Sequence, residues 1–200
     1  RLQDEHAIIL LASTKPGEIK QVTLRDSSVV ILSPSSSLYG KNSGDGGREV
    51  FLAGNGFFKV KHLASNRPFV VHANTINVTV LGTQFNVNTR SSAVEVALTS
   101  GKVKLDRNNG EEHIEFLTPG EKMIATDTSF QKSPIDVSMY SAWTKGEWNF
   151  KNTSLGEIAK LIGDYYAVEV VFPNKRIRDL VIRETLPVSL ALENSQLYIQ

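Results

Sequence analysis

The chain has 200 residues, of which 40% are apolar and 22% are charged, so it is long enough for one large or two modest folded units. Its 22 Lys and Arg residues against 21 Asp and Glu residues leave a net charge of +1, which excludes bulk electrostatic attraction to nucleic acid or to an anionic membrane. The absence of cysteine excludes a disulfide framework, a thiolate metal site and a cysteine nucleophile.

Short β-strands are predicted from residue 7 to residue 130, because apolar and β-branched residues alternate there with polar ones between Gly, Asn, Ser and Pro. Roughly a dozen such strands with no helix among them predict an all-β sandwich or a solenoid-like stack. In chain order the expected strands lie around 22–24, 29–32, 48–52, 57–61, 69–72, 76–81, 85–88, 94–98, 103–105, 114–117 and 123–125.

Three segments between these strands are rich in turn-forming residues. Gly54-Asn55-Gly56 is interpreted as a hairpin turn between the strands at 48–52 and 57–61. Asn109-Gly110 predicts a second hairpin, because both positions of a type I′ turn need a positive φ. Residues 33–47 are rich in Ser and Gly and too many for a hairpin, so we predict a mobile loop there.

A different pattern follows Pro134. Ser154 and Glu157 have the spacing of a capping box, and apolar residues recur behind them at helical spacing. We expect a connector at 138–142, a strand at 148–151, a helix from 154, strands at 166–172 and 177–183, and near 192 the start of a second helix that the end of the chain cuts short. This order predicts a small α+β (β-α-β-β) unit, and with it a mainly β chain of two domains, 1–140 and 141–200.

Candidate catalytic and metal-ligating residues are few. The four histidines lie far apart, and no pair has the i, i+4 spacing of a helical zinc site. The phosphate-binding and nucleophile motifs of common enzyme classes are absent from the sequence. We therefore expect a protein that is not an enzyme, with no catalytic residue, no metal and no cofactor.

Five aromatic residues stand out as candidates for packing. Phe58, Phe69 and Phe85 have polar or β-branched neighbours in strand alternation, which predicts that all three point into one core. Trp143 and Trp148 straddle the expected domain boundary. They could stack on a sugar, but the favoured interpretation is an anchor that packs the two units together.

Several motifs resemble those of the FecR family. Val80–Val87 is similar to the family's "VLGT-x-F-x-V" signature, and Arg67–Val71 is similar to its "RPF-x-V". Leu24–Val29 resembles "L-x-D-G-S-x-V", with Ser27 in place of the usual Gly. The resemblance covers residues 18 to 182 and also includes Arg48–Gly54 with Phe58–Val60, Val94–Val96, Gly101–Val103, Leu117–Glu121 and Trp143 to Leu155.

The segment from Trp143 to Leu155 is similar to a line that opens a C-terminal module of the family, related to the short N-terminal domain of secretins and TonB-dependent transporters. The resemblance thus implies a FecR-type all-β domain at 1–140, followed at 141–200 by this module. FecR-like proteins are single-pass regulators of the inner membrane that bind an extracytoplasmic-function sigma factor on the cytoplasmic side.

The resemblance implies that this chain is the periplasmic, signal-receiving region of such an anti-sigma regulator. Its expected partner is the N-terminal signalling domain of a TonB-dependent outer-membrane transporter, whose substrate loading is relayed to the sigma factor. In a full-length regulator of this family, a cytoplasmic segment binds the sigma factor and one helix spans the membrane. Neither segment is expected within this chain, so its links to the sigma factor and to the membrane are expected to be indirect. The alternative from a different class is an extracellular β-sandwich that binds a carbohydrate directly.

A partner-binding surface is expected on the C-terminal unit, because so few strands leave a strand edge unpaired. Every second residue from 166 to 172 should face the helix, so the opposite face and the basic cluster beyond the next turn are free for a partner. The alternative is that these charges only solvate the surface. The candidate partner-binding residues are Glu169, Val171, Lys175, Arg176 and Arg178.

Overall fold

The computed structural model describes residues 7–41, 48–107, 113–145, 147–150, 152–166 and 168–187. The protein is mainly β, as predicted, and none of its described residues between 20 and 130 is helical. In these described ranges, no helix is both long enough and apolar enough to cross a membrane.

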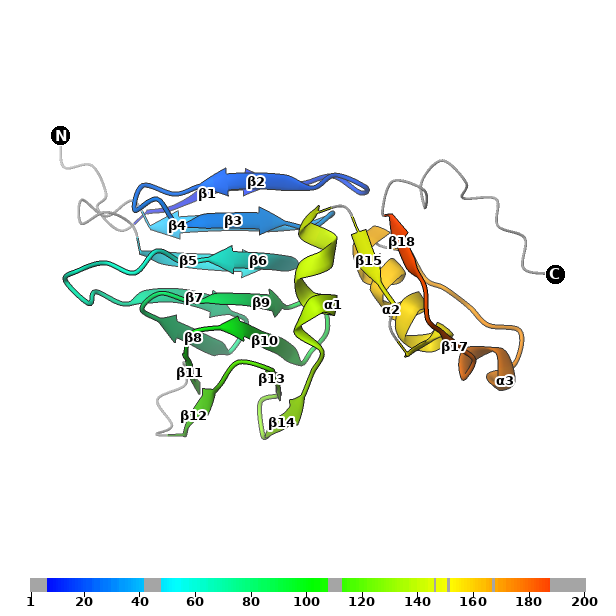
Figure 1. Cartoon of the computed structure of the whole chain (residues 1–200). Coiled ribbons are helices and arrows are strands. Elements are labelled where there is room, and N and C mark those ends of the chain that lie inside the picture. The colour runs from blue at the N-terminus through cyan, green and yellow to red at the C-terminus, as the bar shows by residue number, and fades with distance from the viewer. Residues whose placement is uncertain are drawn as a thin grey trace.

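Fourteen strands up to residue 134 form two seven-stranded sheets, which are stacked in two layers (Figure 1). The first sheet contains, in spatial order, β1 (Ile8–Ser13), β4 (Ser37–Lys41), β5 (Glu49–Ala53), β7 (Phe69–Ala73), β8 (Ile76–Val80), β11 (Val103–Arg107) and β12 (Ile114–Leu117). The second contains β14 (Phe130–Pro134), β13 (Glu121–Ala125), β10 (Val94–Ser100), β9 (Gln84–Asn88), β6 (Asn55–Lys59), β3 (Val29–Leu32) and β2 (Lys20–Thr23). Neighbouring strands are antiparallel except β5 and β7, which run parallel.

The chain changes sheets at Gly54, so the interpretation of residues 54–56 as a hairpin turn is wrong. Strand β5 belongs to the first sheet and β6 to the second, and the two do not pair. Gly54 makes this change with a φ of 106°, a conformation that side chains rarely adopt. A Cβ atom at this position would also lie 2.8 Å from the Cα of Ser36. Asn55 and Gly56 are the first residues of β6.

The predicted mobile loop at 33–47 is wrong for its first half, because Ser37–Lys41 forms β4 between β1 and β5. The Ser-rich sequence hides this strand, in which Leu38 is fully buried. Residues 42–47 and the Asn109-Gly110 turn lie outside the described residues. The strands on either side of that turn, β11 and β12, pair in antiparallel register as expected of a hairpin.

The space between the two sheets is filled by one apolar core. Phe58, Phe69 and Phe85 are completely buried in it, as predicted. The ring centroids of Phe58 and Phe85 are 5.1 Å apart, and those of Phe58 and Phe69 are 6.4 Å apart. Phe58 is therefore the centre of an aromatic group that spans both sheets, since Phe69 belongs to the first and the other two belong to the second.

The residues after β14 form the C-terminal elements: α1 (Val137–Ala142), η1 (Trp143–Lys145), β15 (Glu147–Asn149), β16 (Thr153–Ser154), α2 (Leu155–Tyr166), α3 (Lys175–Arg178), β17 (Val181–Ile182) and β18 (Thr185–Pro187). The expected connector at 138–142 is a helix, which begins where Asp136 accepts a hydrogen bond of 3.0 Å from the Ser138 N–H. Its six residues are too few to show helical periodicity in the sequence. Two-stranded pairs β15–β18 and β16–β17 complete this part, and residues from 188 lie outside the described ranges.

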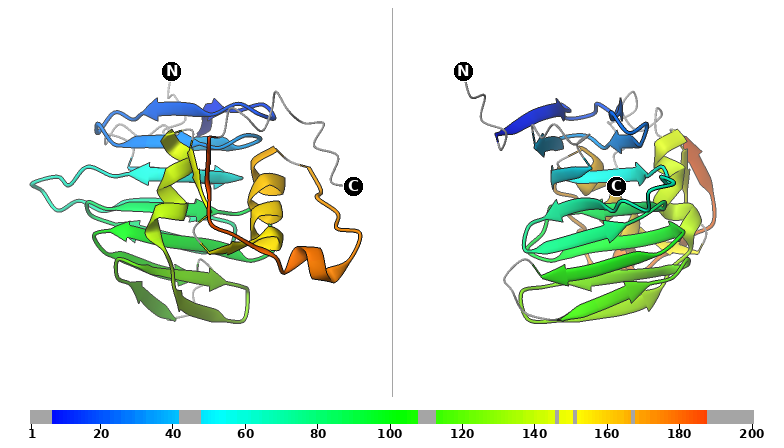
Figure 2. Two further views of the ribbon diagram at one scale, coloured as in Figure 1. Left: turned by 45° about the vertical axis from the view of Figure 1, so that its right-hand side comes forward. Right: turned by 90° about the vertical axis from the view of Figure 1, so that its left-hand side faces the viewer.

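A second apolar cluster joins the outer face of the second sheet to the C-terminal elements, which lie along one side of the sandwich (Figure 2). Because of it, β3 and β6 are buried on both faces: Val30 and Phe58 belong to the inner core, whereas Ile31 and Phe57 belong to the second cluster. The buried members of this cluster are Ile31, Phe57, Trp143, Trp148, Phe150 and Ile158.

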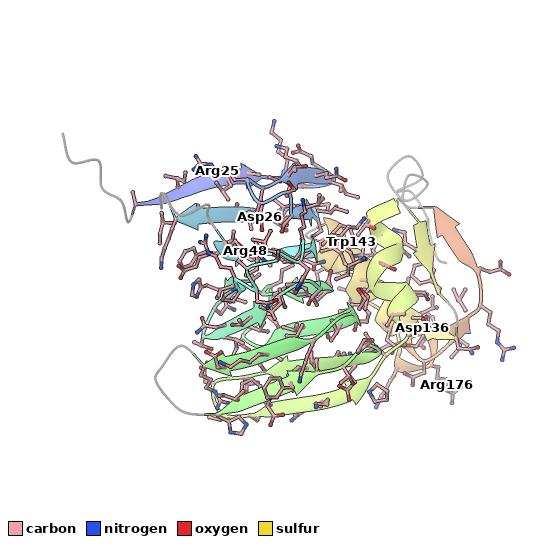
Figure 3. The ribbon with its side chains drawn as sticks, turned by 60° about the vertical axis from the view of Figure 1, so that its left-hand side comes forward. Arg25, Asp26, Arg48, Asp136, Trp143 and Arg176 are labelled. Atoms are coloured by element: carbon pink, nitrogen blue, oxygen red, sulfur yellow. The ribbon has the colours of Figure 1, made fainter. Side chains whose placement is uncertain are left out.

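A buried ion pair between Arg48 and Asp26 connects the two sheets at one end of the sandwich (Figure 3). The Arg48 Nη1 donates to the Asp26 Oδ2 over 2.6 Å, and the two side chains are only 2% and 5% exposed. The same guanidinium donates to the backbone carbonyls of Lys61, Pro68 and Leu81. Burial lowers the pKa of Arg48, and the nearby Asp26 carboxylate opposes that change. The pair thus ties together five chain segments that are distant in sequence.

Ser27, which stands where the related motif usually has Gly, occupies the tight turn that presents Asp26. Its φ is 65°, in the left-handed region that costs a non-glycine residue about 1–2 kcal/mol. The Ser27 N–H donates to the Leu24 carbonyl over 3.0 Å. The turn therefore keeps a conformation suited to glycine although its side chain has changed.

Replacing Phe58 with Ala should lower the free energy of unfolding by about 3–5 kcal/mol, because a fully enclosed ring is lost from the centre of the core. Phe116→Ala is the matched control, since Phe116 is 46% exposed, and it should cost less than about 1 kcal/mol. Urea unfolding followed by circular dichroism measures both. Equal losses for the two variants would contradict the assignment of Phe58 to the core.

Asp26→Asn should lower the free energy of unfolding by about 3–5 kcal/mol, because it leaves the Arg48 charge buried without its counter-ion. The double variant Asp26→Asn/Arg48→Met should recover part of this loss, since no uncompensated charge remains. A double-mutant cycle by urea unfolding separates the two effects. Additive losses in the double variant would show that the two side chains do not depend on each other.

Candidate functional site

The C-terminal groove is an open hollow between α2 and the extended segment 168–172, with a volume of about 700 Å³. The one-turn helix α3 closes one of its sides. Its lining residues are Gly156, Ala159, Lys160, Gly163, Val168–Phe172, Asn174, Lys175 and Arg178.

The helix that forms one wall begins at the predicted capping box. The Glu157 carboxylate accepts hydrogen bonds from the backbone N–H of Ser154 over 2.9 Å and from its hydroxyl over 2.8 Å. The Glu157 N–H donates in return to the Ser154 hydroxyl over 3.2 Å. The hydrogen bonds from Ser154 lower the pKa of Glu157, because they stabilise the ionised carboxylate. The capping-box prediction is confirmed, and it determines where α2 starts.

Two glycines in α2 allow other parts of the C-terminal unit to approach the helix closely. A Cβ atom at Gly163 would lie 2.7 Å from the Val168 carbonyl oxygen, and one at Gly156 would lie 2.7 Å from the Arg178 Cγ. The Val168 N–H donates to the Gly163 carbonyl over 3.1 Å, which turns the chain back along the helix. The glycines that weaken the helix in isolation are therefore needed for the shape of the groove.

The predicted strand at 166–172 is wrong, because no strand covers residues 168–172. The expected inward orientation is also wrong for Val168 and Val170, which are 51% and 40% exposed. Val171 is 77% exposed, in agreement with an outward position. In the described chain β16 pairs with β17 and β15 with β18, so this apolar segment is left outside every sheet.

The predicted strand at 177–183 is wrong in its first half, where α3 forms instead. Asn174 caps this helix, because its side-chain oxygen accepts a hydrogen bond of 3.1 Å from the Ile177 N–H. Only Val181 and Ile182 are in a strand, β17. The short helix places three basic side chains close together at the edge of the groove.

Four of the five candidate partner-binding residues line the C-terminal groove, namely Glu169, Val171, Lys175 and Arg178. Arg176 does not line it but stands on the same one-turn helix (Figure 3). All five side chains are exposed. The structure thus brings the sequence candidates together by a different local fold from the one expected.

Trp143 and Trp148 act as the anchor that the sequence predicted. They are only 6% and 8% exposed, and both belong to the second apolar cluster. The Trp148 ring also stacks on Phe150, with centroids 5.8 Å apart. Their sheet-side partners, Ile31 and Phe57, were not singled out from the sequence. The consecutive apolar residues Val29–Leu32 and Phe57-Phe58 were the signal, because such runs are typical of strands buried on both faces.

Possible metal ligands do not gather within the part of the chain that the structure describes, which contains no group of three or more His, Asp or Glu side chains placed to hold an ion. His72 contacts Glu49 over 2.6 Å and Asn77 over 2.7 Å, and its ring stacks on Phe51. These contacts give His72 a structural role, in packing and hydrogen bonding within the first sheet.

Two family models match the chain: the one described as "FecR protein" over residues 11–104, and "FecR, C-terminal" over residues 147–192. Two crystal structures of "a putative anti-sigma factor" from Parabacteroides distasonis ATCC 8503 are similar to it. Both have a TM-score of 0.70 and cover 94% of this chain and 92% of their own, with sequence identities of 26% and 25%. No curated protein sequence matches the chain.

Glu157→Ala should destabilise α2 by about 1 kcal/mol, because two capping hydrogen bonds are lost. The folded-state pKa of Glu157 lies below its ordinary value of 4.5. The difference between wild type and variant should therefore be complete above that value and disappear as the pH falls through the lower folded-state pKa. Hydrogen exchange of α2 amides at several pH values measures it, with Glu169→Ala as the control. A difference that persists in strong acid would contradict the capping role.

Proposed function

Since the chain belongs to the FecR family, we propose that it is the periplasmic, signal-receiving region of a transmembrane anti-sigma regulator. In this proposal the chain relays substrate loading of a TonB-dependent outer-membrane transporter to an extracytoplasmic-function sigma factor. Sigma-factor binding and membrane anchoring are assigned to segments other than these 200 residues. The family matches and the similar anti-sigma structures support the regulatory role.

The observation that carries the proposal is an exposed apolar segment beside the C-terminal groove. Residues 168–172 contain three valines, which favour β-structure, yet in the described chain no strand pairs with them. Three of these five residues are large, apolar and at least 40% exposed. A backbone of this kind offers hydrogen-bonding groups to an incoming strand, and addition of a strand is a common mode of recognition.

The charges around the segment favour a partner with an acidic surface. Lys175, Arg176 and Arg178 lie within four consecutive residues of α3, and all three are exposed. Glu169 adds one opposite charge within the groove. Clustered basic side chains at the rim of an apolar surface steer an acidic partner and determine its orientation more than they add affinity. We therefore assign the transporter's signalling domain to this groove and its basic edge.

The variant Arg176→Glu/Arg178→Glu should bind the transporter's signalling domain at least about tenfold more weakly at low salt, and with less dependence on salt, because the steering charges are reversed. Isothermal calorimetry with the purified signalling domain measures both effects. Arg176→Glu alone is the cleaner change, since the Arg178 side chain also packs against Gly156.

The matched control is Lys59→Glu/Lys61→Glu, which reverses two exposed charges at the end of β6. It should leave the affinity unchanged, and circular dichroism should show the same β fold in all variants. Unchanged affinity of the Arg176→Glu/Arg178→Glu variant at low salt would place the partner surface elsewhere on the chain.

A further inference from the structure

The junction cavity is a second hollow, on the other side of α2 from the C-terminal groove. It has a volume of about 140 Å³ and lies between the outer face of the second sheet and the elements α1, η1, β15 and α2. Lys160 of α2 lines both hollows. The cavity is lined by Asn55, Asn86, Asn88, Glu95, Lys122, Tyr140, Trp143, Trp148, Glu157, Lys160 and Leu161.

The floor of the cavity is polar although it is covered. Asn86 is 4% exposed, and its Nδ2 donates to the Asn55 Oδ1 over 2.8 Å. Its Oδ1 is buried and accepts no hydrogen bond among the described residues. The amide could be turned over, but one polar end of Asn86 would still lack a partner. A buried amide oxygen left without a hydrogen bond costs about 1–3 kcal/mol, so its donor has to come from a molecule inside the cavity.

Other residues on the same face of the second sheet make an apolar contact with the C-terminal elements. Next to the polar floor, Ile31 of β3 and Phe57 of β6 contact the C-terminal elements through the second apolar cluster. Asn86 of β9 stands directly opposite Phe57 in the sheet register. Holding the C-terminal unit on the sheet explains the apolar half of the junction, whereas it does not explain the polar half.

Three aromatic side chains cover this floor. Tyr140 of α1 donates a hydrogen bond to Glu95 of β10, and burial together with the Glu95 charge raises the pKa of the Tyr140 hydroxyl, so it keeps its proton. Trp143 and Trp148 complete the aromatic cover. Aromatic faces beside amide and hydroxyl groups suit a ligand with both C–H faces and hydroxyl groups.

The charges of the cavity compensate one another. Lys122 and Glu95 form an ion pair of 3.4 Å, and Lys122 also attracts Glu157 of α2. With Lys160, the lining contains two basic and two acidic side chains, which sum to zero. A cation or an anion would therefore gain little from entering, whereas a neutral ligand with hydroxyl groups finds both donors and acceptors.

We propose that the junction cavity binds one neutral, polyhydroxylated small molecule of monosaccharide size. A volume of about 140 Å³ holds roughly four or five waters at about 30 Å³ each, which matches one sugar ring. The Asn86 and Tyr140 side chains would contact the hydroxyl groups of the ligand, and the tryptophans its C–H face. Because α2 separates this cavity from the C-terminal groove, a bound ligand would strengthen the contact of α2 with the sheet.

The experiment uses the whole chain without any partner, so its failure is independent of the transporter proposal. Trp143 and Trp148 are the only two tryptophans of the sequence, and both line the cavity, so tryptophan fluorescence reports on the junction that contains it. D-glucose, D-galactose, D-mannose and D-xylose are titrated separately, each also as its methyl glycoside, which represents the end of a longer glycan. At least one should give a saturable change and raise the melting temperature, with half-saturation below about 10 mM; sodium phosphate and lysine should give none.

Two variants connect binding to the cavity. Asn86→Leu, of similar size and without the amide group, should keep the β fold in circular dichroism and reduce sugar affinity by at least tenfold. Tyr140→Phe should weaken sugar affinity two- to tenfold, which is the effect of one lost hydrogen bond. The control Tyr39→Phe, on β4 and outside the cavity, should bind the sugar as the wild type does. The proposal is overturned if none of these sugars gives a saturable change, or if Asn86→Leu binds as tightly as the wild type.

Discussion

The buried ion pair between Arg48 and Asp26 is the contact on which the sandwich depends. It is placed where the start of β5, the turn before β3 and the ends of β6 and β8 converge, so one guanidinium holds both sheets in register. The motif residues that mark the family, from "L-x-D" through "RPF" to "VLGT", meet at this point. They are far apart in sequence, and their order along the chain reflects the order in which strands return to the same end of the sandwich.

A rigid second sheet in turn positions the C-terminal elements. Its strands β3 and β6 are buried on both faces, so the outer face needs a cover, and the two tryptophans with Phe150 and Ile158 supply it. Helix α2 then separates two hollows of different chemistry. The open C-terminal groove has a basic edge, whereas the junction cavity has a floor of amide side chains, a cover of aromatic rings and no net charge. Because both hollows share this helix, binding in one of them can shift α2 and so change the other.

Local chemistry was sufficient to predict most of the β-rich part. The strands from β5 to β13 follow from alternation and turn residues, and the capping box of Ser154 and Glu157 correctly located the start of α2. The prediction failed where one local sequence signal is compatible with two different structures. Gly54 signals a positive φ, which serves a change of sheet as well as a hairpin, and the alternation at 168–172 describes a strand that finds no partner in the described chain.

The sequence by itself determined the family, the mainly β class and the three core phenylalanines, because each depends on residue type and spacing. It also supplied the five candidate partner-binding residues, which stay a prediction. Only the tertiary structure decided that Asp26 and Arg48 meet, that Ile31 and Phe57 receive the tryptophans, and that Asn86 is buried beneath them. The physical reason is that these contacts join segments 22 to more than 100 residues apart. Spacing along one strand or helix indicates which face a residue occupies, whereas the partner on that face is set by how the sheets and helices pack.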